Sequence, residues 1–281
     1  MAPASICPNG WVKPALLVTA IMVLTIVATA VDFTSAGTTS KVRVAIIDGG
    51  VDPNYPALNA ANIDVRTIPG TPSRVSEHGS AMAAILVESA QSVTVARAPN
   101  IEILDIPALD ASGVGEVESL TDGIETAAQQ DVDVIVAALG VEMDTPELKE
   151  AVSQAQENGV FILAAAGNGI GSFTLYPAEY EEVISVGAVN KNGDRLRFTN
   201  TRASDLLAPG DNIRVESRGG GFQPYSGTSP ATAIAAGKIV GCWPLIAPRN
   251  FDRSRRNTPV DQAIERSIEA QGKDPQECKS L

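Results

Sequence analysis

Four side chains in this sequence are of the types that together can break an acyl bond. They are Asp48 in AIIDGG, His78 in SEHGS, Asn168 in AAAGN and Ser229 in YSGTSP, in that order along the chain. An imidazole that is oriented by a carboxylate can take the proton of a serine hydroxyl and so make it a nucleophile. A side-chain amide can stabilise the oxyanion that such an attack produces. The set therefore indicates nucleophilic acyl chemistry.

Each member of the set also has an ordinary structural interpretation. A strand that ends in Asp-Gly-Gly or Gly-Asn is commonly a turn, and a lone histidine is more often structural. Ser229 can be an N-cap, with Pro230 at the first helical position. The same helix N-terminus would favour the negative charge that forms when a serine attacks. The combination is more specific than its parts, because each residue lies at the end of an expected element and glycines allow close backbone approach.

Alternating strands and helices are expected to position these residues. Apolar stretches predict strands at 42–47, 93–97, 101–106, 132–139, 160–165 and 183–186, and helices are expected at 78–90, at 116–130, from Thr145-Pro146 onward and from Pro259 onward. Strands that are apolar throughout and alternate with helices predict an α/β fold, with a doubly wound, mostly parallel central sheet and helices on both faces. We expect one such domain. Ligands of these sheets bind at the carboxyl ends of the strands.

The N-terminal segment is expected to lie outside this domain. Ala15–Val31 is uncharged and apolar, with Lys13 before it and Asp32 after it. Its length falls between that of a signal-peptide core and that of a membrane span, so residues 1–31 are predicted to be a signal peptide or a membrane anchor. Residues 32–41 are small and polar, typical of a linker, and residues 42–281 are assigned to the catalytic domain with a C-terminal helical tail. Either alternative places the domain outside the cytoplasm, secreted or anchored.

Charge and cysteine usage narrow the class of function. The formal net charge of −12 would repel a nucleic-acid backbone, so we expect no nucleic-acid partner. The cysteines and the lone histidine do not have metal-ligand spacing, and we predict neither a metal nor a cofactor. Without the N-terminal segment, Cys242 and Cys278 remain as an even pair. They form either a disulfide that fastens the tail in an oxidising compartment or two free thiols. Nothing in the sequence indicates the oligomeric state.

Four short blocks carry a family resemblance: Asp48-Gly49-Gly50, His78-Gly79-Ser80, Ala166-Gly167-Asn168 and Gly227-Thr228-Ser229. In this order they resemble the signature blocks of the subtilisin-like serine proteases, the subtilases. The similarity runs from about residue 42 to about residue 241. It implies a serine endopeptidase in which Ser229 attacks a peptide carbonyl, His78 transfers the proton and Asp48 orients the imidazole. The amide of Asn168 and the backbone N–H of Ser229 would hold the oxyanion.

The resemblance also implies where a polypeptide substrate binds. Ala138-Leu139-Gly140 resembles the family strand that pairs with the substrate backbone, and Gly113-Val114-Gly115 resembles the opposing edge. Leu175 corresponds to the base of the primary pocket. A branched side chain there would shorten the pocket, so we expect a small or medium apolar residue before the cleaved bond.

Some features depart from the family pattern and leave other functions open. Ala233 stands where the family usually has a proline, Ala57 where it often has an acidic residue, and the segment before residue 42 leaves no room for the usual propeptide. One alternative function is a non-catalytic binding module that keeps the fold. Another is a peptide ligase or cyclase, in which the same triad transfers the acyl group to an amine.

Overall fold

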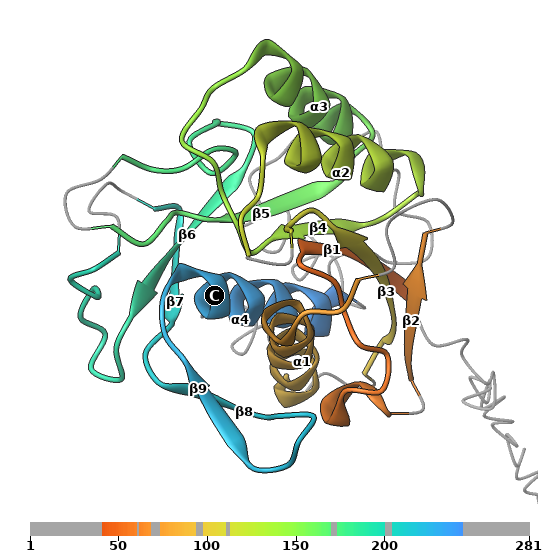
Figure 1. The fold of residues 1–281 in the computed structure, drawn as a ribbon, viewed down its shortest axis with the longest axis vertical. Helices are drawn as coiled ribbons and strands as arrows, with labels where there is room; N and C mark the ends of the chain where they lie inside the picture. Colours follow the sequence, from red (N-terminus) through yellow and green to blue (C-terminus); the bar gives the residue numbers. More distant parts are fainter. Residues whose placement is uncertain are drawn as a thin grey trace, which may run out of the picture. The chain divides into compact units, whose positions relative to one another are not determined.

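A seven-stranded parallel sheet forms the centre of the fold (Figure 1). The computed structural model describes residues 41–60, 62–68, 74–93, 98–110, 113–169, 173–199 and 204–243. Along the sheet the order is β2-β3-β1-β4-β5-β6-β7. The strands are β1 (Lys41–Asp48), β2 (Ile63–Thr67), β3 (Asn100–Pro107), β4 (Val134–Ala137), β5 (Phe161–Ala165), β6 (Ile184–Val189) and β7 (Leu206–Pro209).

Helices cover both faces of this sheet (Figure 1). Helices α1 (Glu77–Ser92) and α4 (Thr228–Gly241) pack on one face, and α2 (Val117–Gln129) and α3 (Pro146–Glu157) on the other. A short 3-10 helix, η1 (Pro56–Leu58), and an antiparallel hairpin of β8 (Ile213–Glu216) and β9 (Phe222–Tyr225) lie beside α1. The predicted doubly wound α/β architecture is confirmed.

The two-sided covering explains why the central strands are apolar at every position. In β1, Val44 and Ile46 join the core under α1 and α4, whereas Ala45 and Ile47 join the core under α2 and α3. Alternate side chains of a strand point to opposite faces, so both faces of β1 must be apolar. Small residues let α1 and α4 touch. A Cβ on Gly237 of α4 would lie 2.3 Å from the Leu86 carbonyl oxygen of α1.

Most expected elements are present, with shifts at their ends. Helix α3 starts as predicted, with Pro146 in its first turn and the Thr145 hydroxyl accepting from the N–H of Leu148 at 3.2 Å. The structural alternative for Ser229, that it is the N-cap of α4, does not hold. Gly227 occupies the cap with φ 133°, and the helix begins at Thr228. Strands β2, β7, β8 and β9 were not predicted from the sequence; they are short, and each has at most one buried residue.

Several predictions fall on residues outside the described ranges. These are the signal or anchor segment 1–31, most of the linker 32–41, most of the strand expected at 93–97 and the helix expected from Pro259. Within the described residues, no helix is both long and apolar enough to cross a membrane. Cys242 is disulfide-bonded. Cys278 lies outside the described ranges, so its pairing with Cys242 stays a prediction.

A buried carboxylate of β3 pairs with basic side chains from β1 and β2. The Glu102 side chain in β3 is only 4% exposed, and Arg66 of β2 donates to its Oε1 at 2.7 Å. Lys41 forms an ion pair with Glu102, and Arg43 lies 3.6 Å from Oε2. Burial alone would raise the Glu102 pKa, but the hydrogen bonds from Lys41 and Arg66 hold that pKa below its usual range. This cluster joins β1, β2 and β3 through the carboxylate of Glu102.

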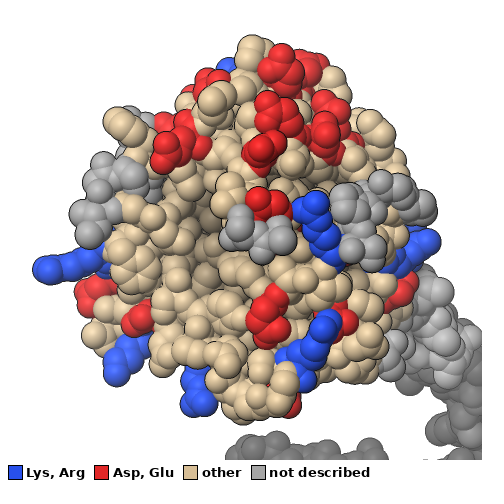
Figure 2. Space-filling model, in the orientation of Figure 1, with Lys and Arg blue, Asp and Glu red and all other residues tan. Residues whose placement is uncertain are grey.

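Acidic side chains gather over α2 and α3 on the face drawn in Figure 2. Exposed acidic residues of these helices include Glu118, Asp122, Glu147 and Glu150. This surface is negative, in keeping with the net charge of −12.

Candidate active site

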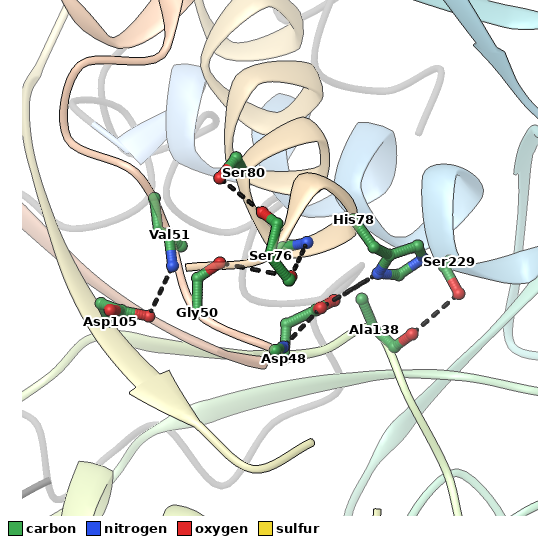
Figure 3. Close-up of polar contacts among 11 residues, drawn as sticks. Asp48, Gly50, Val51, Ser76, His78, Ser80, Asp105, Ala138 and Ser229 are labelled. Carbon is green, nitrogen blue, oxygen red and sulfur yellow. Dashed lines mark hydrogen bonds and ion pairs between the residues drawn. The ribbon is translucent and has the colours of Figure 1, made fainter. Parts of the chain in front are cut away.

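Asp48 and His78 meet at the carboxyl end of β1 (Figure 3). Asp48 is the last residue of that strand and is fully buried. Its two carboxylate oxygens lie 2.8 and 3.0 Å from Nδ1 of His78. Oδ1 also accepts from the Gly49 N–H at 2.6 Å. The carboxylate is thus held in place from both sides, and it fixes the plane of the imidazole.

His78 lies in the first turn of α1, which places its ring next to this carboxylate. Ser76 is the N-cap, and its hydroxyl accepts from the N–H of Gly79 at 2.8 Å. Gly79 is needed because a Cβ there would lie 2.6 Å from the Gly50 carbonyl oxygen and 3.1 Å from Asp48 Oδ1. Ser76 was not predicted to have this role, although a serine three residues before the glycine of His-Gly is a capping signal.

The protonation of His78 follows from this pairing. Because Nδ1 faces a carboxylate, it carries the hydrogen, and Nε2 keeps its lone pair for another proton. Burial favours the neutral ring and lowers the His78 pKa, but the hydrogen bond and the negative charge of Asp48 outweigh it, and the net shift is upward. The side chain remains 39% exposed, so part of the ring is open to solvent. The His78 imidazole, oriented by Asp48, can therefore act as a general base.

Ser229 enters the site on the first turn of α4. It follows Thr228, the first helical residue, and Figure 3 shows its side chain beyond the His78 ring, on the side away from Asp48. In this conformation the Ser229 hydroxyl donates to the Ala138 carbonyl at 2.7 Å. Its hydrogen is therefore not directed at the imidazole. A turn of the hydroxyl about the Cα–Cβ bond, between staggered positions, redirects it.

Asn168 lies beside the start of α4. Its Oδ1 accepts from the Thr228 N–H at 2.9 Å and from the Thr228 hydroxyl at 3.3 Å. An N–H can only be matched by the amide oxygen, so these contacts fix the orientation of the Asn168 amide and leave its NH₂ group exposed. Gly227 permits the approach, since a Cβ there would lie 2.8 Å from the amide. From the sequence, Thr228 was named only as part of the block 227–229, although its backbone and side chain position Asn168.

A second buried carboxyl lies near Asp48. Asp105 in β3 is 2% exposed and accepts from the Val51 N–H at 3.0 Å. Burial raises the Asp105 pKa to about 7, the hydrogen bond from Val51 opposes this, and the negative charge of Asp48 adds to it. Asp105 therefore carries a proton over part of the pH range in which Asp48 pairs with the imidazole.

Two backbone segments line the space next to the site. Ala138-Leu139-Gly140 continues beyond the end of β4, and Gly113-Val114-Gly115 forms a loop that bridges back to Leu109. Asp110 closes this loop by accepting from the Val114 N–H at 3.0 Å and donating to the Val114 carbonyl at 2.9 Å. A Cβ on Gly115 would lie 4.0 Å from Cδ1 of Leu139, so the two segments approach each other.

Leu175 fills the space between two glycines of the site. A Cβ on Gly140 would lie 2.7 Å from the Leu175 Cβ, and a Cβ on Gly167 would lie 2.8 Å from the Leu175 Cγ. The Leu175 backbone is fixed as well, since its N–H donates to the Ala166 carbonyl at 3.1 Å. The leucine side chain thus occupies the space between these two backbones.

Within the described residues, no three His, Cys, Asp or Glu side chains cluster closely enough to hold a metal ion. The site consists of acid–base and nucleophilic groups near the carboxyl ends of the central strands.

Comparison with known proteins identifies a family and several relatives. The model of the Subtilase family matches residues 39–248. Subtilisin E of Bacillus subtilis (strain 168) is 36% identical over 210 residues, which cover 71% of this chain and 55% of that protein. The intracellular serine protease of Paenibacillus polymyxa is 36% identical over 242 residues, 81% of this chain and 74% of that protein. The chain thus spans little more than half the length of subtilisin E.

Solved structures give the same picture. The prenylagaramide maturation protease PagA superposes with a TM-score of 0.64 at 28% identity, covering 80% of this chain and 93% of PagA. The patellamide maturation protease PatA superposes with a TM-score of 0.63 at 26% identity, covering 84% of this chain and 99% of PatA.

Proposed function

Because this chain belongs to the subtilase family, we propose that it is a serine endopeptidase whose nucleophile is Ser229. The Ser229 Oγ attacks a peptide carbonyl carbon while Nε2 of His78 takes its proton, and Asp48 stabilises the resulting imidazolium. His78 then protonates the leaving amine as the C–N bond breaks. Water hydrolyses the acyl-enzyme by the same proton transfers in reverse.

The observation that carries this proposal is the hydrogen bond of 2.8 Å between Nδ1 of His78 and the carboxylate of Asp48, at the carboxyl end of β1. This hydrogen bond favours the tautomer in which Nδ1 carries the hydrogen, so that Nε2, on the side of the ring away from the carboxylate, is the basic nitrogen. A structural histidine has no need of a fully buried carboxylate on one ring nitrogen and an open face on the other. A non-catalytic module likewise requires none of these contacts.

The oxyanion of the tetrahedral intermediate is assigned to two donors near the start of α4. The amide NH₂ of Asn168 is one, since its oxygen is already engaged with Thr228. The backbone N–H of Ser229 is the other, because first-turn N–H groups of a helix have no partner within the helix. The positive end of the helix dipole supports the same charge.

The proposed substrate is an extended polypeptide that pairs with the two backbone segments. Residues 138–140 and 113–115 would offer main-chain groups to it, which gives binding with modest sequence selectivity. Leu175 blocks the space between Gly140 and Gly167 and so restricts the residue before the cleaved bond to small or medium apolar types.

A location outside the cytoplasm stays a prediction. It depends on the apolar stretch Ala15–Val31. A disulfide at Cys242 is in keeping with an oxidising compartment. N-terminal sequencing of the protein recovered from cell fractions would test both the compartment and the cleavage of residues 1–31.

Labelling with a fluorophosphonate tests the enzymatic proposal directly. Wild type should be labelled at Ser229, and Ser229→Ala should not be labelled. Ser226→Ala is the matched control, because Ser226 is an exposed serine three residues away whose hydroxyl accepts from Asn212. This control should label like wild type. A folded wild type that is not labelled would refute the proposal.

A further inference from the structure

An ion pair fastens the turn of the β8–β9 hairpin to the loop that follows β1. Arg218 in the turn pairs with the carboxylate of Asp52, whose side chain is only 6% exposed. Oδ1 of Asp52 also accepts from the Asn54 N–H at 3.0 Å. Burial would raise the Asp52 pKa, but the hydrogen bonds from Asn54 and Arg218 hold that pKa below its usual range. Asp52 is therefore a buried anion, and Arg218 supplies a cation beside it.

Asp52 is itself joined to the helix that carries His78. Its backbone N–H donates to the Ser80 hydroxyl at 2.9 Å, and that hydroxyl donates to the Ser76 carbonyl at 2.7 Å. Ser76 is the N-cap of α1, so these bonds connect Asp52 to the turn in which His78 lies. Figure 3 shows Ser76, His78 and Ser80 at the same end of α1. The ion pair thus holds the hairpin against the start of this helix.

The turn of the hairpin and most of β9 have few other attachments. Val215 of β8 is fully buried, but residues 222–224 of β9 are exposed. Residues 219–221 of the turn are three successive glycines, the residue type with the least restricted backbone. Within the described residues, the other hydrogen bonds of the turn 217–221 stay inside the turn. A two-stranded hairpin is marginally stable by itself, so the pair with Asp52 should determine where β9 lies.

The last residue of β9 reaches the proposed catalytic groups. The rings of Tyr225 and His78 lie edge to face, with centroids 6.2 Å apart and an angle of 71° between their planes. In the proposed mechanism His78 gives a proton to the leaving amine, so the peptide that follows the cleaved bond passes next to this imidazole. Tyr225 therefore borders the path of the leaving peptide.

We propose that Arg218 and Asp52 are positioning residues, which hold β9 against α1 and so form the surface that receives the peptide after the cleaved bond. The inference rests on the proposed function. Without the ion pair, the carboxylate of Asp52 stays buried without this cation, and the exposed part of β9 can move away from α1. Tyr225 then loses its fixed place beside His78.

The proposed nucleophile does not depend on this ion pair. The Gly227 N–H, at the cap of α4, donates to the Gly210 carbonyl at 2.8 Å, and the Thr228 N–H donates to Asn168 at 2.9 Å. Loss of the ion pair should therefore leave Ser229 in place. It should affect only substrates that extend past the cleaved bond.

Two substrates with the same residues before the cleaved bond separate this role from a general structural one. One is a peptide that continues for several residues after that bond, and the other is a p-nitroanilide that ends at it. We would measure kcat/KM for both, the rate of phosphonylation of Ser229 by a small fluorophosphonate, and the melting temperature. Arg218→Ala removes the cation. Arg214→Ala is the matched control, because Arg214 lies in β8 of the same hairpin and contacts the Phe222 ring, 5.2 Å from its centroid.

Arg218→Ala should lose about tenfold in kcat/KM for the extended peptide and less than about twofold for the p-nitroanilide, with an unchanged phosphonylation rate. Arg218→Lys keeps the charge and should retain most of the activity on the extended peptide. Asp52→Asn should show the same selective loss as Arg218→Ala. The double variant Arg218→Ala/Asp52→Asn should lose no more than the single ones, because each breaks the same pair. Arg214→Ala should keep the wild-type ratio of the two substrates.

A wild-type ratio in Arg218→Ala would overturn the assignment, and so would an equal loss on both substrates, as a general structural role requires. The same change of ratio in Arg214→Ala would also overturn it, because the effect would then come from the charge of the hairpin. These results leave the proposed function intact. A folded wild type that is not phosphonylated at Ser229 refutes that function, and the positioning role with it.

Discussion

Leu175 should decide which peptides are cleaved, and shortening it should change the preference. In the structure its side chain occupies the gap between the Gly140 and Gly167 backbones, with atoms 2.7 and 2.8 Å from where their Cβ atoms would be. Leu175→Ala removes the Cγ and both Cδ atoms and opens this gap. We expect wild type to favour Ala over Phe before the cleaved bond, and the variant to accept Phe.

The size of the effect follows from the apolar surface that a phenylalanine ring can bury in the opened space. Burying a side chain of this size is worth about 1.5–3 kcal/mol. One factor of ten corresponds to about 1.4 kcal/mol, so the ratio of kcat/KM for Phe over Ala should rise about 10- to 100-fold. Leu175 is only half-buried, so the loss of stability should stay below the roughly 2–5 kcal/mol of a fully buried leucine.

The assay compares two peptides that differ only in the residue before the cleaved bond. Leu207→Ala is the control, since Leu207 lies in β7 and is 42% exposed, and its ratio should match wild type. A wild type that already prefers Phe would refute the argument. So would an unchanged ratio in a Leu175→Ala protein that still labels at Ser229.

Three further predictions concern charge and hydrogen bonds at the site. Because the pKa of His78 is raised, kcat/KM should increase with pH through a midpoint above 6.5. Asp48→Asn should lower that midpoint and should reduce kcat by about 10⁴, the loss that the corresponding change causes in a serine protease with an Asp-His-Ser triad. Asn168→Ala should raise the barrier by about 2.7–4 kcal/mol, the range known for an oxyanion donor in subtilisin, with little change in KM. The native pKa of Asp105, about 7, lies above its ordinary 3.8, so the native state retains a proton that the unfolded chain has lost, and stability should fall as pH rises between these values. Asp105→Asn should flatten this dependence and be more stable than wild type at pH 8 in urea titrations, because its Oδ1 can still accept from Val51.

The sequence was sufficient to predict the architecture. It was also sufficient to predict the polar residues that lie at the ends of strands and helices. Runs such as 42–47 and 160–165 are apolar throughout, and only strands covered on both faces require this. Asp48 and Asn168 follow directly from such runs, so their place at one sheet edge could be predicted. The capping pair Thr145-Pro146 fixed the start of α3 for a local reason, because both residues act within one turn.

Features that depend on contacts between distant segments could not be predicted. Tyr55 and Glu77 are 22 residues apart, and no local pattern marks the hydrogen bond between them. The cap of α4 was misassigned because serine before proline is a common start signal. Here the close approach of Asn168 requires a residue without a Cβ at position 227. This glycine is the cap, so the helix begins at Thr228, one residue before Ser229.

Strand β3 carries two buried carboxyls whose pKa values move in opposite directions. Glu102, surrounded by cations, loses its stabilising charge when acid protonates it, whereas the buried Asp105 costs stability as the pH rises from 3.8 to about 7 and its carboxyl has to ionise. The contributions of these two carboxyls to stability are therefore both retained only at mildly acidic pH. Since the imidazole is protonated there, self-digestion should also be slowest, so a purified stock should keep best under conditions in which the enzyme is idle.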